Sequence, residues 1–217
     1  SREALKQIIF DLIERNKIET SGIKMIVTGG YSSDSFEPGK PNFIITQQPV
    51  KIASEEEFEK GVRIMLYDYL RDVPTAKSIN YLMAVYLQKT LAQKNAGDVL
   101  YCNNNRILEF PRSNVFIVTP DKRVVTPLDD VLHGITRKKV LEIAGKEYQA
   151  EQRAISVEEL KRASEVFLTS TTKRLLPVLA IDDHVVGDGT PGEITRKLCK
   201  EFIELEKIYC AKQSVGS

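Results

Sequence analysis

The stretch Lys77-Ser78-Ile79-Asn80-Tyr81-Leu82 decides how this sequence is interpreted, because three further motifs follow it in order. They are the run Glu109-Phe110-Pro111-Arg112-Ser113-Asn114-Val115-Phe116, the turn Gly134-Ile135-Thr136-Arg137 and the hydroxyl-rich run Thr169-Ser170-Thr171-Thr172. Each motif alone has an ordinary structural explanation: a surface lysine, a strand-end glutamate, an N-cap threonine, or a turn bonded through hydroxyl groups. The four motifs are therefore informative only because they occur together in this order.

The first part of the chain predicts a small domain. Residues 3–16 place apolar side chains on one face of a helix, and residues 23–28 and 42–46 predict two strands separated by a loop that begins at residues 29–34. Periodicity is lost over Gln47-Gln48-Pro49, where proline forbids regular continuation. We therefore predict that residues 1–48 are the remainder of a small N-terminal domain, 49–54 a linker and 55–217 a larger domain.

The rest of the chain predicts a mixed α/β domain with meandering strands. The predicted strands are 62–67, 99–102, 106–109, 115–119, 124–126, 166–169 and 178–181, and the predicted helices are 79–91, 136–144, 157–163 and 194–209. Asn103-Asn104-Asn105 predicts a hairpin turn. Ser156 and Glu159 predict a capping box. Lys77 is expected at or just before a helix that packs into the core.

Composition excludes several classes of protein. The chain has 217 residues, of which 42% are hydrophobic and 28% charged, so it is long enough to bury one sizeable core or two modest ones. A net charge of +1 argues against general affinity for nucleic acid or anionic membrane, and no apolar stretch approaches the roughly 20 residues that span a bilayer. The three cysteines are widely separated and lack metal-ligand spacing, which favours a reducing, cytoplasmic compartment and no metal site.

In this order and with these neighbours, the four motifs resemble those of the class IV aminotransferases, also called fold type IV pyridoxal phosphate enzymes. The family includes branched-chain and D-amino-acid aminotransferases and aminodeoxychorismate lyase. Residues 77–80 are similar to the Lys-Ser-Leu-Asn stretch around the cofactor lysine of D-amino-acid aminotransferases, and residues 113–116 to a Ser-Asn-Val/Ile-Phe run of the family. The resemblance extends over about residues 3–210. It implies a small N-terminal α/β domain that lacks its start, followed by a larger pseudo-barrel α/β domain that binds the cofactor.

The resemblance also implies roles for individual residues around pyridoxal 5′-phosphate. Lys77 would hold the cofactor aldehyde and shuttle a proton at the substrate Cα. Glu109, whose carboxylate is costly to bury alone, would pair with the protonated ring nitrogen, and Tyr81 with the ring hydroxyl. The residues implied for the phosphate are Ile135, Thr136, Ser170 and Thr171, and the candidate substrate residues are Arg112 and Thr172.

Three departures from the family bear on the pocket and the substrate. Family members carry a further segment before the position of Ser1, with a His-x-x-Arg-Leu motif whose arginine also holds the phosphate, so we expect either truncation or loss of part of the pocket. The loop 29–36 has Asp34-Ser35-Phe36 where bacterial D-amino-acid aminotransferases carry an Arg-x-His carboxylate trap. Strand alternation turns Arg112 away from the Glu109 side unless Pro111 introduces a bulge; otherwise Arg112 is a surface residue.

These observations favour a homodimeric transaminase that moves an amino group between an amino acid and a 2-oxo acid, with branched-chain or other apolar L-amino acids as the leading donors. A lyase of the aminodeoxychorismate lyase type is the alternative on the same cofactor. A truncated, noncatalytic member of the family is a third possibility.

Overall fold

The computed structural model describes residues 1–214 and divides the chain after Ile52 into two compact units. The first unit contains α1 (Arg2–Asn16) and two antiparallel strands, β1 (Ser21–Thr28) and β2 (Asn42–Pro49), in which Ser21 lies opposite Pro49. The prediction that the second strand ends at residue 46 was wrong. The strand continues to Pro49 because β1 supplies pairing partners, and a proline at the strand end removes little of the ladder.

The second unit begins at Ala53 and is built on one large sheet. Its helices are α2 (Glu55–Lys60), α3 (Leu82–Tyr86), α4 (Gln88–Gln93), α5 (Ile135–Ala144), α6 (Val157–Arg162) and α7 (Glu193–Ser214). Its strands are β3 (Val62–Asp68), β4 (Asp98–Asn103), β5 (Arg106–Ile107), β6 (Asn114–Val118), β7 (Val124–Thr126), β8 (Ala150–Gln152), β9 (Glu165–Ser170), β10 (Arg174–Ile181) and β11 (His184–Val185).

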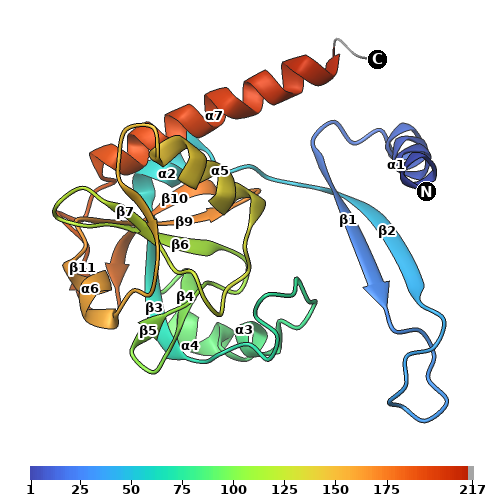
Figure 1. Ribbon diagram of the computed structural model, residues 1–217, viewed down its shortest axis with the longest axis horizontal. Coiled ribbons are helices and arrows are strands. Elements are labelled where there is room, and N and C mark those ends of the chain that lie inside the picture. The colour runs from blue at the N-terminus through green and yellow to red at the C-terminus, as the bar shows by residue number, and fades with distance from the viewer. Residues whose placement is uncertain (215–217) are drawn as a thin grey trace. The chain divides into compact units, whose positions relative to one another are not determined.

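The sheet is mixed and curled, which gives the α/β pseudo-barrel that the sequence predicts (Figure 1). The strand order is β5-β4-β3-β10-β9-β6-β7-β8, with β11 paired to β10. The pairs β3/β10, β3/β4 and β7/β8 are parallel, and the other pairs are antiparallel. The two edges approach each other: the Ile107 N–H donates to the Ile155 carbonyl at 2.8 Å, and Arg106 and Ser156 form an isolated bridge.

The central strand β6 separates two hydrophobic cores, since all five of its residues are buried and alternate between the sheet faces. Val115 and Ile117 pack into the core that includes Phe110 and Leu160. Phe116 stacks on Phe167 with ring centroids 5.0 Å apart, in the core covered by α5 and α7. The strand is therefore a rigid support for the residues that precede it, from Glu109 to Ser113.

Several predicted elements are corrected by the structure. The helix expected over residues 79–91 begins only at Leu82 and is divided at Leu87 into α3 and α4. Leu87 and Leu91 pack into the core, whereas Leu82 and Tyr86 are exposed. The apolar spacing continues across the break at Leu87, and for this reason it predicted one helix instead of two. The hairpin β4/β5 turns at Asn104 and Asn105, both with positive φ, as asparagine permits.

Other differences concern short elements and a cap. The sequence missed α2, β8 and β11, which contain only two to six residues each, and it underestimated β10, which begins at Arg174. The capping box predicted at α6 is only half formed. Ser156 Oγ accepts from the Glu159 N–H at 3.0 Å, but the Glu159 carboxylate pairs with Arg153.

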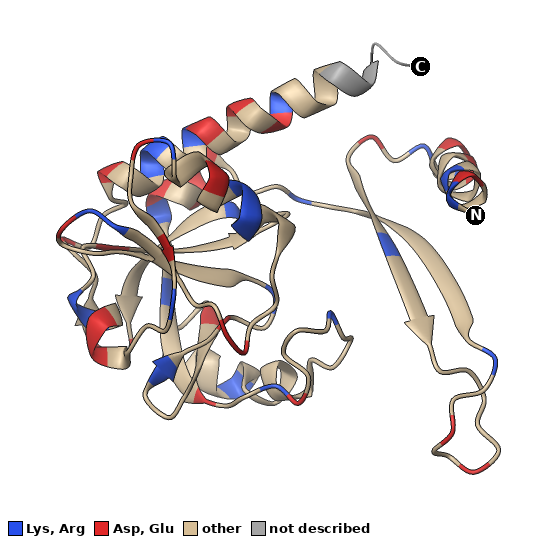
Figure 2. Ribbon diagram, viewed as in Figure 1, with Lys and Arg blue, Asp and Glu red and all other residues tan. Residues whose placement is uncertain are grey.

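Residues of both charges are mixed along the chain. Lys and Arg residues are interspersed with Asp and Glu residues, most visibly along α7 (Figure 2). Within residues 1–214, no helix combines the length and the apolar character needed to cross a membrane.

Candidate active site

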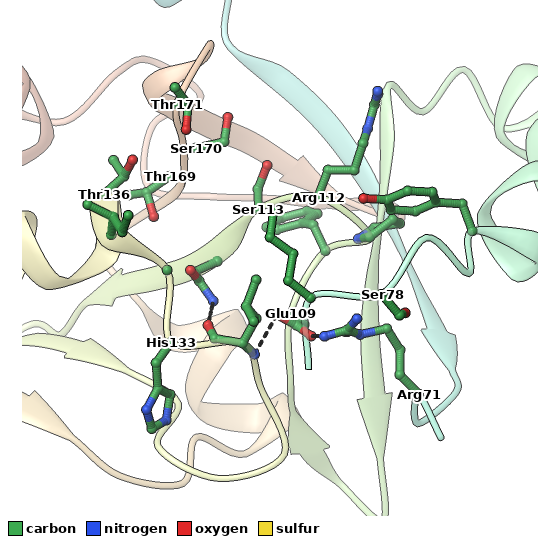
Figure 3. A pocket seen from close by; sticks show the side chains of 18 residues that line it. Arg71, Ser78, Glu109, Arg112, Ser113, His133, Thr136, Thr169, Ser170 and Thr171 are labelled. Carbon is green, nitrogen blue, oxygen red and sulfur yellow. Dashed lines mark hydrogen bonds and ion pairs between the residues drawn. The ribbon is translucent and has the colours of Figure 1, made fainter. Parts of the chain in front are cut away.

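A cavity of about 230 Å³ in the second unit brings most of the predicted site residues together. It is lined by Lys77, Tyr81, Glu109, Arg112, Ile135, Thr136, Ser170 and Thr171, all named from the sequence, and by Arg71, Ser78, Phe110, Pro111, Ser113, Asn114, Leu132, His133, Gly134 and Thr169. Figure 3 shows these side chains converging from the loop before α3, the segment before β6, the start of α5 and the end of β9. Thr172 is not among the lining residues, and its carbonyl accepts from the Ala53 N–H at 2.9 Å.

Glu109 lies at the floor of this cavity, two residues after β5 and only 4% exposed. Its Oε1 accepts from Arg71 Nε at 2.9 Å and from Arg71 Nη2 at 2.5 Å, and its Oε2 accepts from the Leu132 N–H at 2.9 Å (Figure 3). Burial raises the pKa of Glu109 above its ordinary value, while the Leu132 N–H, Arg71 and Lys77 act in the opposite direction. The carboxylate is thus oriented from two sides and faced by cations.

Lys77 lies on a loop, not on a helix. The segment before α3 is held by short turns, in which the Ala76 N–H donates to the Val73 carbonyl at 3.1 Å and the Ser78 N–H to the Ala76 carbonyl at 2.9 Å. Lys77 is exposed and lines the cavity. Tyr81 is the N-cap residue of α3 and half-buried, so the two residues share the cavity without sharing a helical face.

The start of α5 presents unsatisfied N–H groups to the cavity. Gly134 is the N-cap residue, and no side chain caps the helix, so the alternative of Thr136 as an ordinary N-cap is wrong. Asn114 Nδ2 donates to the Leu132 carbonyl at 2.7 Å, and a Cβ on Gly134 would lie 2.4 Å from Asn114 Oδ1. The absence of that Cβ lets the helix start approach β6 closely, and such a helix start favours an anion.

The end of β9 forms the opposite wall. Thr169 is 2% exposed, and its Oγ1 has no hydrogen-bond partner among the described residues although it lines the cavity. Ser170 Oγ accepts from the Lys173 N–H at 3.2 Å, which leaves its own hydrogen available. A buried hydroxyl group without a partner is costly, so this wall is suited to a polar ligand.

Arg112 reaches the cavity because the chain turns at Pro111 and Arg112. Phe110 and Ser113 form an isolated bridge around these two residues, and the Phe110 N–H donates to the Ser113 carbonyl at 2.9 Å. Strand alternation therefore does not apply, and Arg112 lines the same cavity as Glu109 with an exposed side chain (Figure 3).

Sequence reasoning missed Arg71, the backbone role of Leu132 and the position of His133 in the cavity wall. His133 is exposed and lines the cavity, with Nε2 lying 3.0 Å from the Leu128 carbonyl oxygen. Arg71 has no neighbouring motif, and Leu132 acts through its backbone. In the sequence, the only indication of a cationic partner was the high cost of burying the Glu109 carboxylate alone.

An amine that lines the cavity, a buried carboxylate and two walls suited to an anion are features of an enzyme site of the kind that holds a phosphorylated aldehyde cofactor. The amino-transferase class IV family model matches residues 1–181. D-alanine aminotransferase of Bacillus licheniformis is 29% identical over 206 residues, which cover 91% of this chain and 72% of the relative. A putative branched-chain-amino-acid aminotransferase of Methanocaldococcus jannaschii is 27% identical over 214 residues, covering 94% of this chain and 74% of that protein.

Solved structures agree on the fold. A branched-chain amino acid aminotransferase from Thermobaculum terrenum in its pyridoxal phosphate form has a TM-score of 0.79 at 25% identity, with 92% of this chain and 68% of the other covered. A putative 4-amino-4-deoxychorismate lyase from Legionella pneumophila has a TM-score of 0.81 at 24% identity, with 91% and 75% covered. The chain belongs to the class IV aminotransferases, which are pyridoxal phosphate enzymes of fold type IV.

The residues present fit that cofactor. The Thr169 hydroxyl, which has no partner among the described residues, and the start of α5, which no described side chain caps, are suited to a phosphate. Glu109 offers a carboxylate that could pair with a ring nitrogen, and Lys77 offers an amine that could hold an aldehyde. The phosphate, ring nitrogen and aldehyde of one molecule therefore have matching groups in one cavity.

Proposed function

We propose that this chain catalyses amino-group transfer between an apolar L-amino acid and a 2-oxo acid. The observation that carries the proposal is that Lys77, Glu109, the start of α5 and the end of β9 line a single cavity. When bound, the cofactor supplies an electron sink conjugated with the substrate Cα. The remaining tasks are binding, orientation and proton transfer, which belong to the protein.

Each wall of the cavity has one of these tasks. The N–H groups of Ile135 and Thr136 and the hydroxyl groups of Ser170 and Thr171 bind the phosphate and fix one end of the cofactor. Glu109 keeps the ring nitrogen protonated. Lys77 would hold the cofactor aldehyde and, once displaced by the substrate amine, would act as the general base and acid that moves the proton at the substrate Cα.

The preference for L-amino acids is supported by the loop of the first unit. Between residues 29 and 36 there is no arginine or histidine with which to bind a substrate carboxylate. The Asp34 carboxylate accepts from the Phe36 and Glu37 N–H groups, both at 2.8 Å, and these bonds lower its pKa to about 2. The loop is therefore closed on itself by the Asp34 carboxylate and contains no cation of the kind that forms a carboxylate trap. The D-alanine aminotransferase relatives make stereochemistry the property to test.

The test compares L-leucine, L-valine and D-alanine as donors to 2-oxoglutarate, with glutamate formation as the readout. We expect both L-amino acids to be used with at least roughly tenfold higher kcat/KM than D-alanine, a difference of about 1.4 kcal/mol. Preferential use of D-alanine would overturn the stereochemical proposal. Product formation from aminodeoxychorismate without an amino-group acceptor would instead identify a lyase. Lys77→Ala is the control, and it should abolish activity and the visible absorbance of the bound cofactor.

A homodimer is supported by apolar side chains around the loop that carries Lys77. Val73, Ile79, Leu82, Val85 and Tyr86 are 58–76% exposed, and large exposed patches of this kind mark interaction surfaces. We expect a dimer in sedimentation velocity at micromolar concentration and a monomer after Leu82→Glu. The equivalent change at Val185, an exposed apolar residue on β11, is the matched control and should leave the dimer intact.

A further inference from the structure

Arg71 is a buried charged residue of the cavity to which the mechanism above gives no task. Its side chain is 12% exposed, and three of its nitrogens are used. Nε and Nη2 donate to Glu109 Oε1, Nη2 also donates to the Pro74 carbonyl at 2.6 Å, and Nη1 lies 3.5 Å from the Ala76 carbonyl. One guanidinium group thus joins the Glu109 carboxylate to the loop that carries Lys77, as Figure 3 shows for the contact with Glu109.

The contacts continue beyond Glu109 to the anion-binding wall. The second carboxylate oxygen of Glu109 accepts from the Leu132 N–H, and the Leu132 carbonyl accepts from Asn114 Nδ2 and, at 2.9 Å, from the Gly134 N–H at the start of α5. Hydrogen bonds therefore connect the backbone of the Lys77 loop through Arg71, Glu109 and Leu132 to the start of α5. They join the three places that would contact the aldehyde, the ring nitrogen and the phosphate.

We propose that Arg71 is a positioning residue that sets the distance and orientation of the Lys77 loop relative to Glu109 before the cofactor binds. The proposal rests on the proposed cofactor site. The geometry of the guanidinium group, and not its charge alone, is what the role requires. A planar fork with five donors can hold a carboxylate and two carbonyls at once, whereas the ammonium group of a lysine is a single point of charge.

The Lys77 loop needs such a support because little else holds it. Lys77 and Ser78 are exposed, and the neighbouring Val73 and Ile79 are also exposed. Within residues 1–214, the backbone of residues 73–77 is hydrogen-bonded only by the two turn bonds of the loop itself and by Arg71. Without Arg71, the amine would be free to move away from the carboxylate.

The substitution Arg71→Lys distinguishes a role in positioning from a role as a counter-charge, since it keeps the positive charge and removes the planar set of donors. We expect amide exchange of the cofactor-free protein to become at least roughly tenfold faster over residues 72–78. We also expect the dissociation constant of pyridoxal phosphate, measured by fluorescence at equilibrium, to rise at least roughly tenfold, or about 1.4 kcal/mol. Arg71→Met should show the same loop exchange and weaker binding still, because Glu109 then also loses its cation.

Arg196→Lys is the matched control. Arg196 likewise joins a carboxylate, that of Glu59, to a backbone carbonyl, that of Pro191, but it lies outside the cavity. This change should alter neither loop exchange nor cofactor affinity. If Arg71→Lys retains wild-type loop exchange and affinity, Arg71 is only a counter-charge and the proposal is overturned. If the wild-type protein does not bind pyridoxal phosphate, the proposed cofactor site fails instead, and exchange of the cofactor-free loop still decides the role of Arg71.

Discussion

Gly134→Ala tests whether the close approach of α5 to β6 maintains the anion-binding wall. Gly134 has φ −64 and ψ 148, a conformation open to any residue, so alanine causes no backbone strain. The added Cβ would lie 2.4 Å from Asn114 Oδ1 and would force Asn114, which is 6% exposed, to give up its hydrogen bond to the Leu132 carbonyl. A buried polar group left without a partner costs about 1–3 kcal/mol.

Alanine also restricts the unfolded chain, which offsets about 0.4–1 kcal/mol of this cost. The net expectation is a loss of about 1 kcal/mol in the free energy of unfolding of the cofactor-free protein, measured by urea denaturation. Pyridoxal phosphate should also bind more weakly, because Leu132 and the helix start move together.

Gly145→Ala at the other end of α5 is the matched control. A Cβ there meets only the Leu141 carbonyl oxygen at 3.2 Å, so the change should be neutral or slightly stabilising.

The Asn114→Ala background supplies the decisive comparison, since it removes the atom with which the new methyl group collides. In that background Gly134→Ala should become stabilising by about 0.4–1 kcal/mol. A loss of the same size in both backgrounds would refute the reasoning, because the cost would then not arise from the contact with Asn114.

Three further outcomes test other parts of the molecule. Glu109→Gln should retain the cofactor but lose most turnover. It should also lower the free energy of unfolding by about 3–5 kcal/mol, because Arg71 loses its buried counter-charge; unchanged turnover would make the carboxylate merely structural. Arg112→Leu should raise the Michaelis constant for 2-oxoglutarate at least roughly tenfold and that for a monocarboxylic 2-oxo acid less, while equal small effects would leave Arg112 a surface residue. Glu165→Gln should cost about 1–2 kcal/mol in urea denaturation, because the carboxylate accepts from both the Ile194 and Thr195 N–H groups at the start of α7, whereas exposed Glu193→Gln should cost under about 0.5 kcal/mol.

The sequence predicted the central strands and the helices α5, α6 and α7 well, because these elements combine strong periodicity with burial in one of two cores. It was least successful where tertiary contacts override the local pattern. The apolar spacing of residues 79–91 continues across the break at Leu87, so periodicity alone could not show where the helix begins or divides. Likewise, β8 contains only three residues and depends on parallel pairing with the distant β7.

In the candidate site too, residues within local motifs were predicted, whereas a residue whose role depends on distant contacts was not. Eight of the nine residues named from the sequence line the cavity, because their motifs lie at ends of strands and helices that the sheet brings together. Thr172 does not, since it lies in the turn after β9, where its carbonyl accepts from the Ala53 N–H. Arg71 could not be found, because its importance depends on meeting Glu109, which lies 38 positions away in the chain.

The strand order of the sheet has a consequence for how the protein is made. The segments that carry Lys77 and Glu109 follow β3 and β5, whereas the phosphate wall follows β7 and β9. In the sheet, β3 joins the strands of the phosphate wall through its parallel pairing with β10. Outside this ladder, the two parts also meet through the hydrogen bond between Glu109 and Leu132 and through the bridge between Arg106 and Ser156. A nascent chain whose residues 174–181 are still inside the ribosome lacks the strand that lies between β3 and β9. We therefore expect the sheet that supports the site to close only when β10 has paired with a strand made more than a hundred residues earlier.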